Sequence, residues 1–409
     1  MRTPLTAKIE SCNRYLQLAA VLGLSVWFVI SRVISVSQKQ LCLNITKEVK
    51  AFFLIITVSF FLFFATIINN GLFSQTVQRV LAFAGPFLIL CYGFSTDVKK
   101  TQDVLFIMFL ILTAMVFIST IVLYPRGGLV AEDYGKEWLF GAKNTLRNIF
   151  FPAIAMTMIR DCFKGRSMSF STVFIIVMSF ISAILVSSGG TIISLLFLIG
   201  VVFVLKKPQR FDAISKIILC GCAFLDVMFL TAFGFVKDFL SFVSVNFIAF
   251  LLPGRPLGYI ATLSGRTIVW QGVLSKIRQN FVLGNGSQGN SSEILDFRMS
   301  GGYQVTHAHN AVLDIIYRGG AIAAFAMLIL LIICITPVFG KKNDKVAYSL
   351  LGLVLSAFFI SGIIGELWNA GFFFIMFYCL FISKIDNAYT VEKLINLVSA
   401  KTNRKGRVG

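Results

Sequence analysis

Long apolar stretches recur along the chain and alternate with short polar segments. Most are about 20 residues long, which is the length that an α-helix needs to cross a hydrocarbon core about 30 Å thick. The pattern predicts an all-α integral membrane protein with about 11 or 12 transmembrane helices. The predicted spans cover residues 15–36, 50–69, 78–94, 102–124, 148–160, 169–187, 190–205, 213–236, 310–336, 346–364 and 368–383.

The composition agrees with a membrane protein. Of the 409 residues, 57% are hydrophobic and 13% are charged, which is more apolar surface than a soluble fold buries. The eight cysteines form no CxxC pair, and we interpret them as small apolar residues. No internal repeat is visible, and no polar stretch is long enough for a soluble domain with its own core. We therefore expect a single polytopic membrane domain over residues 1–409.

The 37 Lys and Arg outnumber the 18 Asp and Glu, and the cations gather in short loops between the apolar stretches. This is the positive-inside pattern, so we expect anionic membrane lipids as partners and no nucleic acid. With the basic tail of residues 384–409 in the cytoplasm, alternation of the spans places residues 125–147 and 237–310 outside. It also places the N-terminus outside, against its own three cations. Further cytoplasmic cations in this orientation are Lys99–Lys100, Lys164–Arg166, Lys206–Lys207 and Lys341–Lys342.

The longer external segment, residues 237–310, is predicted to form a loop subdomain and is basic on the side of the membrane where cations are scarce. Its charge indicates a bound anion. Apolar residues at helical spacing predict an amphipathic helix from Ser264 to Asn280, with Ser264 as the N-cap and Arg266 in the first turn. Alternatively, the arginines only anchor a surface helix at the interface. The charged residues are Arg255, Arg266, Lys276, Arg278 and Arg298, against Glu293 and Asp296.

Both histidines of the chain, His307 and His309, lie where the next predicted span begins. A neutral imidazole at a water-accessible helix start is well placed to accept a proton near neutral pH. Asn310, Asp314 and Arg318 follow at intervals of four residues, so they line one helical face, and the last two can form an ion pair. This polar stripe indicates either a functional site or a polar contact between helices.

Two cations, Lys143 and Arg147, lie beside the outer start of another predicted span. They could clamp a diphosphate or cap the membrane edge. Asp226, in the middle of a span, is typical of ion or proton coupling and favours an alternative of another class, a lipid or polysaccharide transporter, unless its carboxyl is protonated or paired.

The glycine-rich stretch Gly284–Asn290 matches no complete phosphate-binding fingerprint and lacks the lysine of a Walker loop. We interpret it as a flexible external loop and expect no nucleotide site. The chain also contains no DxD pair, which argues against a metal-dependent sugar-nucleotide transferase. No cofactor and no metal site are predicted.

Three motifs occur together between about residues 264 and 320. They are Ser-Gly-Arg-x-x-x-Trp at Ser264–Trp270, Leu-Gly-x-Gly at Leu283–Gly286, and His-x-His-Asn at His307–Asn310 followed by Arg-Gly-Gly from Arg318. With the many spans, they resemble the O-antigen ligase and Wzy polysaccharide polymerase superfamily. Phe-Gly-Ala-Lys-Asn at Phe140–Asn144 resembles a further family segment.

The resemblance implies a GT-C-type fold and a metal-independent, inverting glycosyltransferase at the outer face of the bacterial plasma membrane. Its donor would be an undecaprenyl-diphosphate-linked oligosaccharide and its acceptor a glycan, with a chain-length regulator and a flippase as possible partners. By motif, His309 would be the catalytic base and Arg266 would bind the diphosphate. We assign substrate binding to Lys143, Arg147, Arg278, His307, Asn310, Asp314 and Arg318.

The chain departs from the family at residues 187–191, which read Ser-Ser-Gly-Gly-Thr where the family often has an Arg after a Ser or Thr. Lys143 or Arg147 would then supply the missing diphosphate contact. We expect a polymerase of repeat units, with a ligase that moves finished glycan to a lipid A-core or another acceptor as the alternative.

Overall fold

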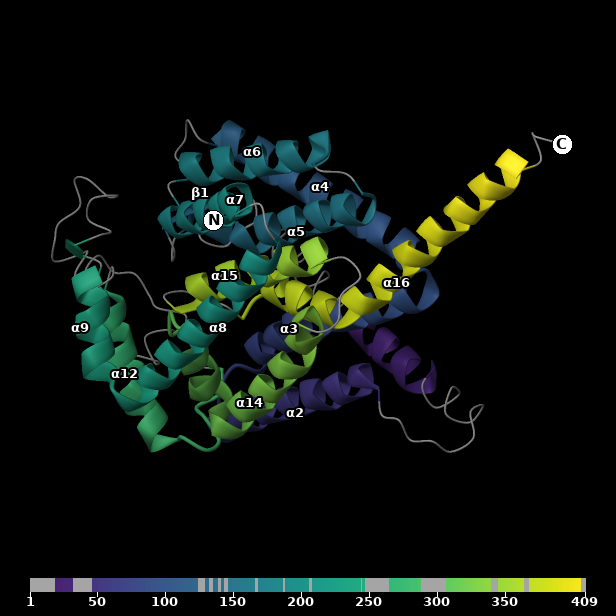
Figure 1. The fold of residues 1–409 in the computed structure, drawn as a ribbon. Coiled ribbons are helices and arrows are strands. Elements are labelled where there is room, and N and C mark those ends of the chain that lie inside the picture. The colour runs from purple at the N-terminus through teal and green to yellow at the C-terminus, as the bar shows by residue number, and fades with distance from the viewer. Residues whose placement is uncertain are drawn as a thin grey trace.

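The computed structural model describes residues 19–31, 46–123, 129–131, 135–138, 141–142, 146–165, 168–186, 188–205, 208–243, 245–246, 265–287, 307–339, 345–363 and 368–405. These residues are almost entirely helical (Figure 1). One small antiparallel sheet has the strand order β1-β2-β3, formed by β1 (Leu129–Ala131), β2 (Gly135–Trp138) and β3 (Gly141–Ala142).

The helices follow the apolar stretches of the sequence, and each predicted span overlaps at least one helix. A first helix covers Ala19–Ser31. The others are α2 (Lys47–Ile68), α3 (Phe73–Thr96), α4 (Val98–Leu123), α5 (Arg147–Phe163), α6 (Phe170–Leu185), α7 (Gly189–Leu205), α8 (Pro208–Thr231), α9 (Phe233–Val243), α12 (Arg266–Gln279), α14 (Ala311–Ile335), α15 (Lys345–Ile363) and α16 (Ala370–Lys405).

Six of these helices are long and apolar enough to cross a membrane. Large apolar side chains such as Phe53 and Phe60 are exposed on the outside of the bundle, as expected where lipid is the solvent. The prediction of an all-α integral membrane protein is confirmed. The described residues contain fewer full-length spans than the predicted 11 or 12, since several apolar helices, such as α6, are shorter. The six spans are Lys47–Ile68, Phe73–Thr96, Val98–Leu123, Ala213–Thr231, Ala311–Phe339 and Ala370–Glu392.

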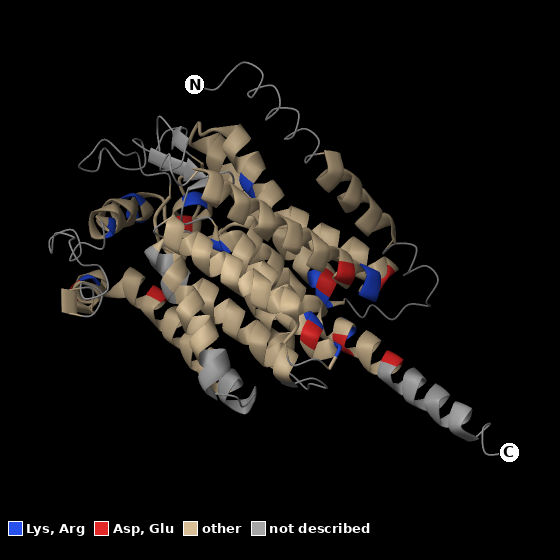
Figure 2. Ribbon diagram, turned by 90° about the horizontal axis from the view of Figure 1, so that it is seen from above, with Lys and Arg blue, Asp and Glu red and all other residues tan. Residues whose placement is uncertain are grey.

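Figure 2 shows the charged residues gathered mainly toward two ends of the bundle, with other residues between them. One group consists of ion pairs between helix ends, including Lys99–Glu392 at 3.0 Å and Arg160–Asp103 at 2.9 Å. Glu392 lies 22 residues after the start of α16 at Ala370, which corresponds to about 33 Å along the helix. Ala370 and Glu392 of α16 therefore lie at opposite ends of the bundle.

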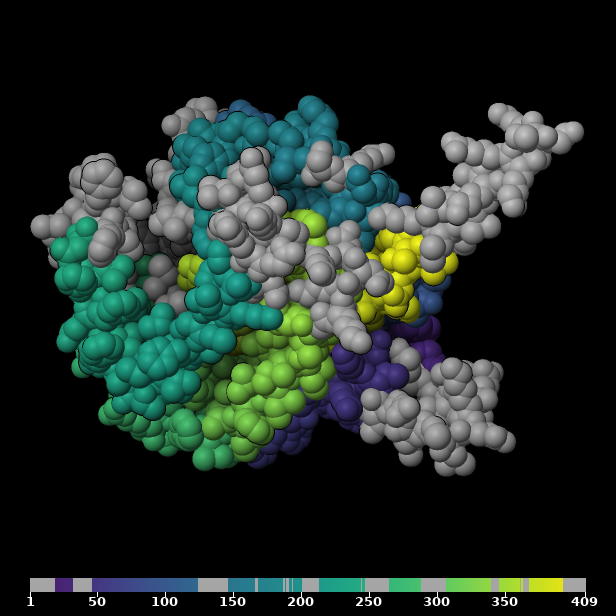
Figure 3. Space-filling model, in the orientation of Figure 1, coloured from purple at the N-terminus to yellow at the C-terminus, as the bar shows by residue number. Residues whose placement is uncertain are grey.

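The helix α14 packs along α2, and the two form adjoining surfaces in Figure 3. At Gly320 its backbone leaves the helical conformation, with φ 72° and ψ −176°. The carbonyls of Tyr317 and Arg318 instead accept hydrogen bonds from the backbone N–H groups of Asn285 (2.6 Å) and Gly286 (2.9 Å). Within a bilayer a helix can break only where its freed backbone groups find such partners.

The segment Gly284–Ser287 that supplies these donors is also bound on its other side. The N–H of Ser287 donates to Thr66 Oγ1 at 3.0 Å, and its carbonyl accepts from the N–H of Leu72 at 2.8 Å. All four residues of the segment are buried. The interpretation of this stretch as a flexible loop is therefore wrong for residues 284–287, because the glycines serve close packing between α2 and α14. Residues 288–290 lie outside the described residues.

We predict that Gly286→Ala destabilises the protein. Gly286 has φ +74°, and a Cβ there would lie 2.5 Å from Thr66 Cα and 2.7 Å from Thr66 N, which are backbone atoms and cannot move aside. The free energy of unfolding should fall by more than about 1 kcal/mol. Thermal unfolding in detergent, followed by size-exclusion chromatography, measures the change. Gly221→Ala is the control, because a Cβ in that part of α8 meets nothing within 4 Å. Equal melting temperatures for both variants would contradict the prediction.

Candidate functional site

The segment His307–Asn310 leads into α14 and has a fixed, unusual conformation. His309 has φ 52°, in the left-handed region that residues other than glycine seldom adopt. Such a conformation costs about 1–3 kcal/mol and persists only where the surroundings impose it. Asn310 caps α14, since its side-chain oxygen accepts the N–H of Leu313 at 2.9 Å. The indole N–H of Trp270 donates to the carbonyl of His309 at 3.4 Å.

The predicted helix around Arg266 is present as α12, with its apolar face, including Trp270, buried against the bundle. Arg266 is its first residue, as expected. The N-cap position is held by Gly265, with φ 83° and no side-chain cap, rather than by Ser264, which lies outside the described residues.

Three helices begin around His309. Arg147 is the first residue of α5, Arg266 the first of α12, and His309 lies two residues before α14. Helix N-termini present free N–H groups and the positive end of the helix dipole. With the two guanidinium groups they make the surroundings of His309 strongly electropositive.

This environment sets the protonation state of His309. Burial lowers its pKa well below the usual 6.5, and interactions with His307, Arg266 and Arg147 lower it further, while the Asp314 carboxylate opposes them. The two imidazole rings lie 4.1 Å apart between centroids. A neutral imidazole at neutral pH is the form that can accept a proton.

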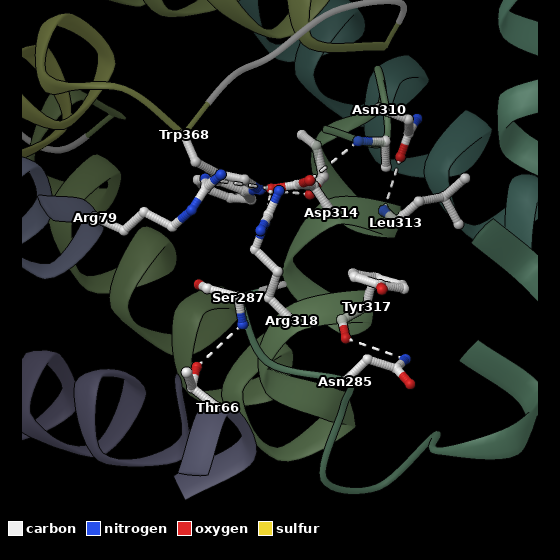
Figure 4. Close-up of polar contacts among 12 residues, drawn as sticks. Thr66, Arg79, Asn285, Ser287, Asn310, Leu313, Asp314, Tyr317, Arg318 and Trp368 are labelled. Atoms are coloured by element: carbon white, nitrogen blue, oxygen red, sulfur yellow. Dashed lines mark hydrogen bonds and ion pairs between the residues drawn. The ribbon is translucent and has the colours of Figure 1, made fainter. Parts of the chain in front are cut away.

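In the first turn of α14, Asp314 forms the buried ion pair with Arg318 that the sequence predicts. Its Oδ2 accepts from Arg318 Nε at 2.9 Å and lies 3.9 Å from a guanidinium nitrogen of Arg79 (Figure 4). Its Oδ1 accepts the N–H of Ala308 at 3.0 Å. The three charged side chains also line a pocket with apolar walls from α2, α3 and α14 and from Trp368. Asp314 therefore connects the His307–Asn310 segment to the ion pair beneath it.

Asp226, on α8, also reaches this segment. Its Oδ1 accepts from Asn310 Nδ2 at 3.3 Å. The carboxylate that suggested a transporter is thus paired with a residue next to His309. Within the described residues no cluster of three or more His, Cys, Asp or Glu side chains is arranged to hold a metal ion.

Most of the predicted site residues meet here, and two were missed. Arg79 and Trp368 were not singled out, although Arg79 is a lone cation in an apolar stretch, a recognisable signal. Trp368 donates its indole N–H to the carbonyl of Ala311. Arg278 does not join them: it is exposed on α12, twelve residues and about 18 Å of helix from Arg266. Lys143 lies outside the described residues.

The comparisons with known proteins agree with the motifs. The model of a family described as O-Antigen ligase matches residues 174–328, which include α12, the His307–Asn310 segment and the first part of α14. No curated protein and no solved structure matches the chain. The resemblance to the O-antigen ligase and Wzy superfamily is confirmed, and with it a function of the glycan ligase or polymerase type in a multi-pass membrane protein.

We predict that His309 remains neutral below the usual imidazole pKa. Because the chain has only two histidines, a sample labelled with ¹⁵N-histidine gives two imidazoles, and His309→Asn assigns them. At pH 6, where an ordinary histidine is mostly protonated, the ¹⁵N chemical shifts of His309 should still be those of a neutral imidazole. The unfolded chain binds a proton at His309 more readily than the folded protein does. The free energy of unfolding is therefore unaffected by His309 above pH 6.5 and decreases as the pH falls below that value. Titration of His309 at or above pH 6.5 would contradict the prediction.

Proposed function

We propose that this chain is a polysaccharide polymerase that transfers glycan repeat units from an undecaprenyl-diphosphate carrier to an acceptor sugar. The observation that carries the proposal is the buried imidazole of His309, held in a left-handed conformation and close enough to Arg266 and Arg147, at two helix N-termini, for their charges to lower its pKa. A base next to an anion-binding surface fits a reaction that deprotonates a hydroxyl and releases a diphosphate.

His309 would act as the general base. As the acceptor hydroxyl gives its proton to the imidazole, its oxygen forms a bond to the anomeric carbon of the donor sugar. The bond from that carbon to the diphosphate oxygen breaks, and the diphosphate leaves with the electron pair. Attack from the side opposite the leaving group inverts the anomeric configuration.

Arg266 and Arg147 would stabilise the negative charge that develops on the diphosphate. Their charges are fixed by α12 and α5 before the substrate arrives, which is the arrangement that makes electrostatic stabilisation effective. Removal of one such contact typically costs about 3 kcal/mol of transition-state stabilisation, or roughly a hundredfold in rate. The proposed contact by Lys143 lies outside the described residues.

The reaction would take place on the outer face of the plasma membrane. The cations Lys99, Arg160 and Lys164 lie at one end of the bundle, and the site lies at the other, where α16 begins. The positive-inside rule assigns the first end to the cytoplasm.

A ligase is the second candidate, because the matching family carries that description. It would use the same base and arginines but transfer finished glycan to a lipid core. The transporter alternative was based on Asp226 and on the all-membrane build of the chain, and the contact of Asp226 with Asn310 gives that carboxylate a role without ion coupling.

We predict that His309→Ala and Arg266→Ala each slow glycan transfer by roughly a hundredfold or more, so that chains no longer reach their normal length. A deletion strain is complemented with each variant at matched membrane levels, and glycan length is read on a gel. Accumulation of single repeat units supports the polymerase, whereas long unattached chains on the carrier support the ligase. Lys99→Ala, which removes an exposed cation paired with Glu392 at the far end, is the control and should restore the normal ladder. Normal glycan in both site variants would refute the proposed function.

A further inference from the structure

The residues on both sides of His309 are each held by a carboxylate. Ala308, which precedes it, donates its backbone N–H to Asp314 at 3.0 Å. Asn310, which follows it, donates its side-chain amide to Asp226 at 3.3 Å. The two carboxylates come from different helices, α14 and α8, so the segment is bound from two directions.

We propose that Asp226 and Asp314 are positioning residues that together hold His309 in its left-handed conformation and aim its imidazole at the acceptor hydroxyl. This inference rests on the proposed function. It gives Asp226 a role that its sequence position did not indicate, and it reassigns Asp314 from binding substrate to orienting the base.

The Asp314 carboxylate is itself rigidly held. Its second oxygen accepts from Arg318 at 2.9 Å and faces Arg79 of α3 at 3.9 Å, and the side chains of Asp314 and Arg318 are only 6% and 3% exposed (Figure 4). Two cations therefore keep the carboxylate ionised and fix its orientation, so that its other oxygen can hold Ala308. A carboxylate with this little exposed surface, and with both oxygens already in contact with the protein, can position the His307–Asn310 segment but offers little surface to a glycan.

Asp226 acts at the other side through the helix cap. Asn310 uses its oxygen to accept the N–H of Leu313 and its nitrogen to donate to Asp226. The Asp226 contact thus fixes which way the amide faces and so keeps the cap in place. Because the cap defines where α14 begins, it also defines where the chain turns at His309.

The two carboxylates should affect His309 differently. Asp314 attracts the protonated imidazole, whereas His307, Arg266 and Arg147 repel it. Loss of the Asp314 charge should therefore lower the pKa of His309 further. Loss of the Asp226 contact should disturb geometry alone. Misplacement by about 1 Å can cost roughly a hundredfold in rate.

The test uses the full-length protein in nanodiscs with lipid-linked glycan extracted from the deletion strain, and measures the rate of transfer against pH. Asp226→Ala should lower the rate at least about tenfold without moving the acidic limb of the profile. Asp226→Asn keeps an oxygen for the Asn310 amide and should recover most of the rate. An Asp226→Asn variant as inactive as Asp226→Ala would mean that the charge is needed, which overturns the positioning role.

For Asp314 the variant is the double change Asp314→Asn and Arg318→Met, because Asp314→Asn alone would leave a buried arginine without its carboxylate. The asparagine oxygen still accepts from Ala308, so the protein should retain measurable transfer. The matched variant Asp314→Ala with Arg318→Met removes the oxygen that holds Ala308 and should transfer at least about tenfold more slowly than the asparagine variant. Equal rates in the two double variants, or wild-type rates in Asp226→Ala, would overturn the inference. If His309→Ala also transfers normally in this assay, the proposed function itself fails; if only the carboxylate variants behave as wild type, the inference alone fails.

Discussion

The structure depends on one constraint of the bilayer: a helix inside it cannot leave carbonyl groups without donors. The break of α14 at Gly320 is possible because Asn285 and Gly286 donate to the freed carbonyls, and the segment Gly284–Ser287 is thereby bound to α14 as well as to Thr66 of α2. The first part of α14, which carries Asp314 and is capped by Asn310, is thereby held in one place.

The site brings together the positive charges of Arg147 and Arg266, which repel each other. Arg147 and Arg266 lie at helix starts around His309, and their positive charges help to lower the pKa of its imidazole. The buried carboxylate of Asp314, which opposes their effect on His309, is itself balanced by Arg318 and Arg79. A donor with a diphosphate would complete this balance, since it brings the negative charge that the arginines lack.

The sequence predicted the elements well because apolar length and helical spacing are local properties, as the helix α12 and the pair Asp314–Arg318 show. It could not predict which helices meet. Asp226 suggested ion coupling only because its partner Asn310 lies 84 residues away. The segment Gly284–Ser287 suggested a loop because its partners on α2 and α14 are distant in sequence. Contacts between residues far apart in sequence are determined by how the helices pack, and a local sequence pattern carries no information about that packing.

The bond between Ser287 and Thr66 has a consequence for assembly. The two residues are 221 positions apart, and at about 5–20 residues per second a ribosome needs roughly 10–40 s to make the chain between them. During that time the Thr66 hydroxyl has nearby partners, Leu62 and Thr76, within its own hairpin. The hydroxyl of Thr66 therefore has hydrogen-bond partners within the hairpin of α2 and α3 before Ser287 is synthesised. The contacts between this hairpin and Gly284–Ser287 form late in synthesis.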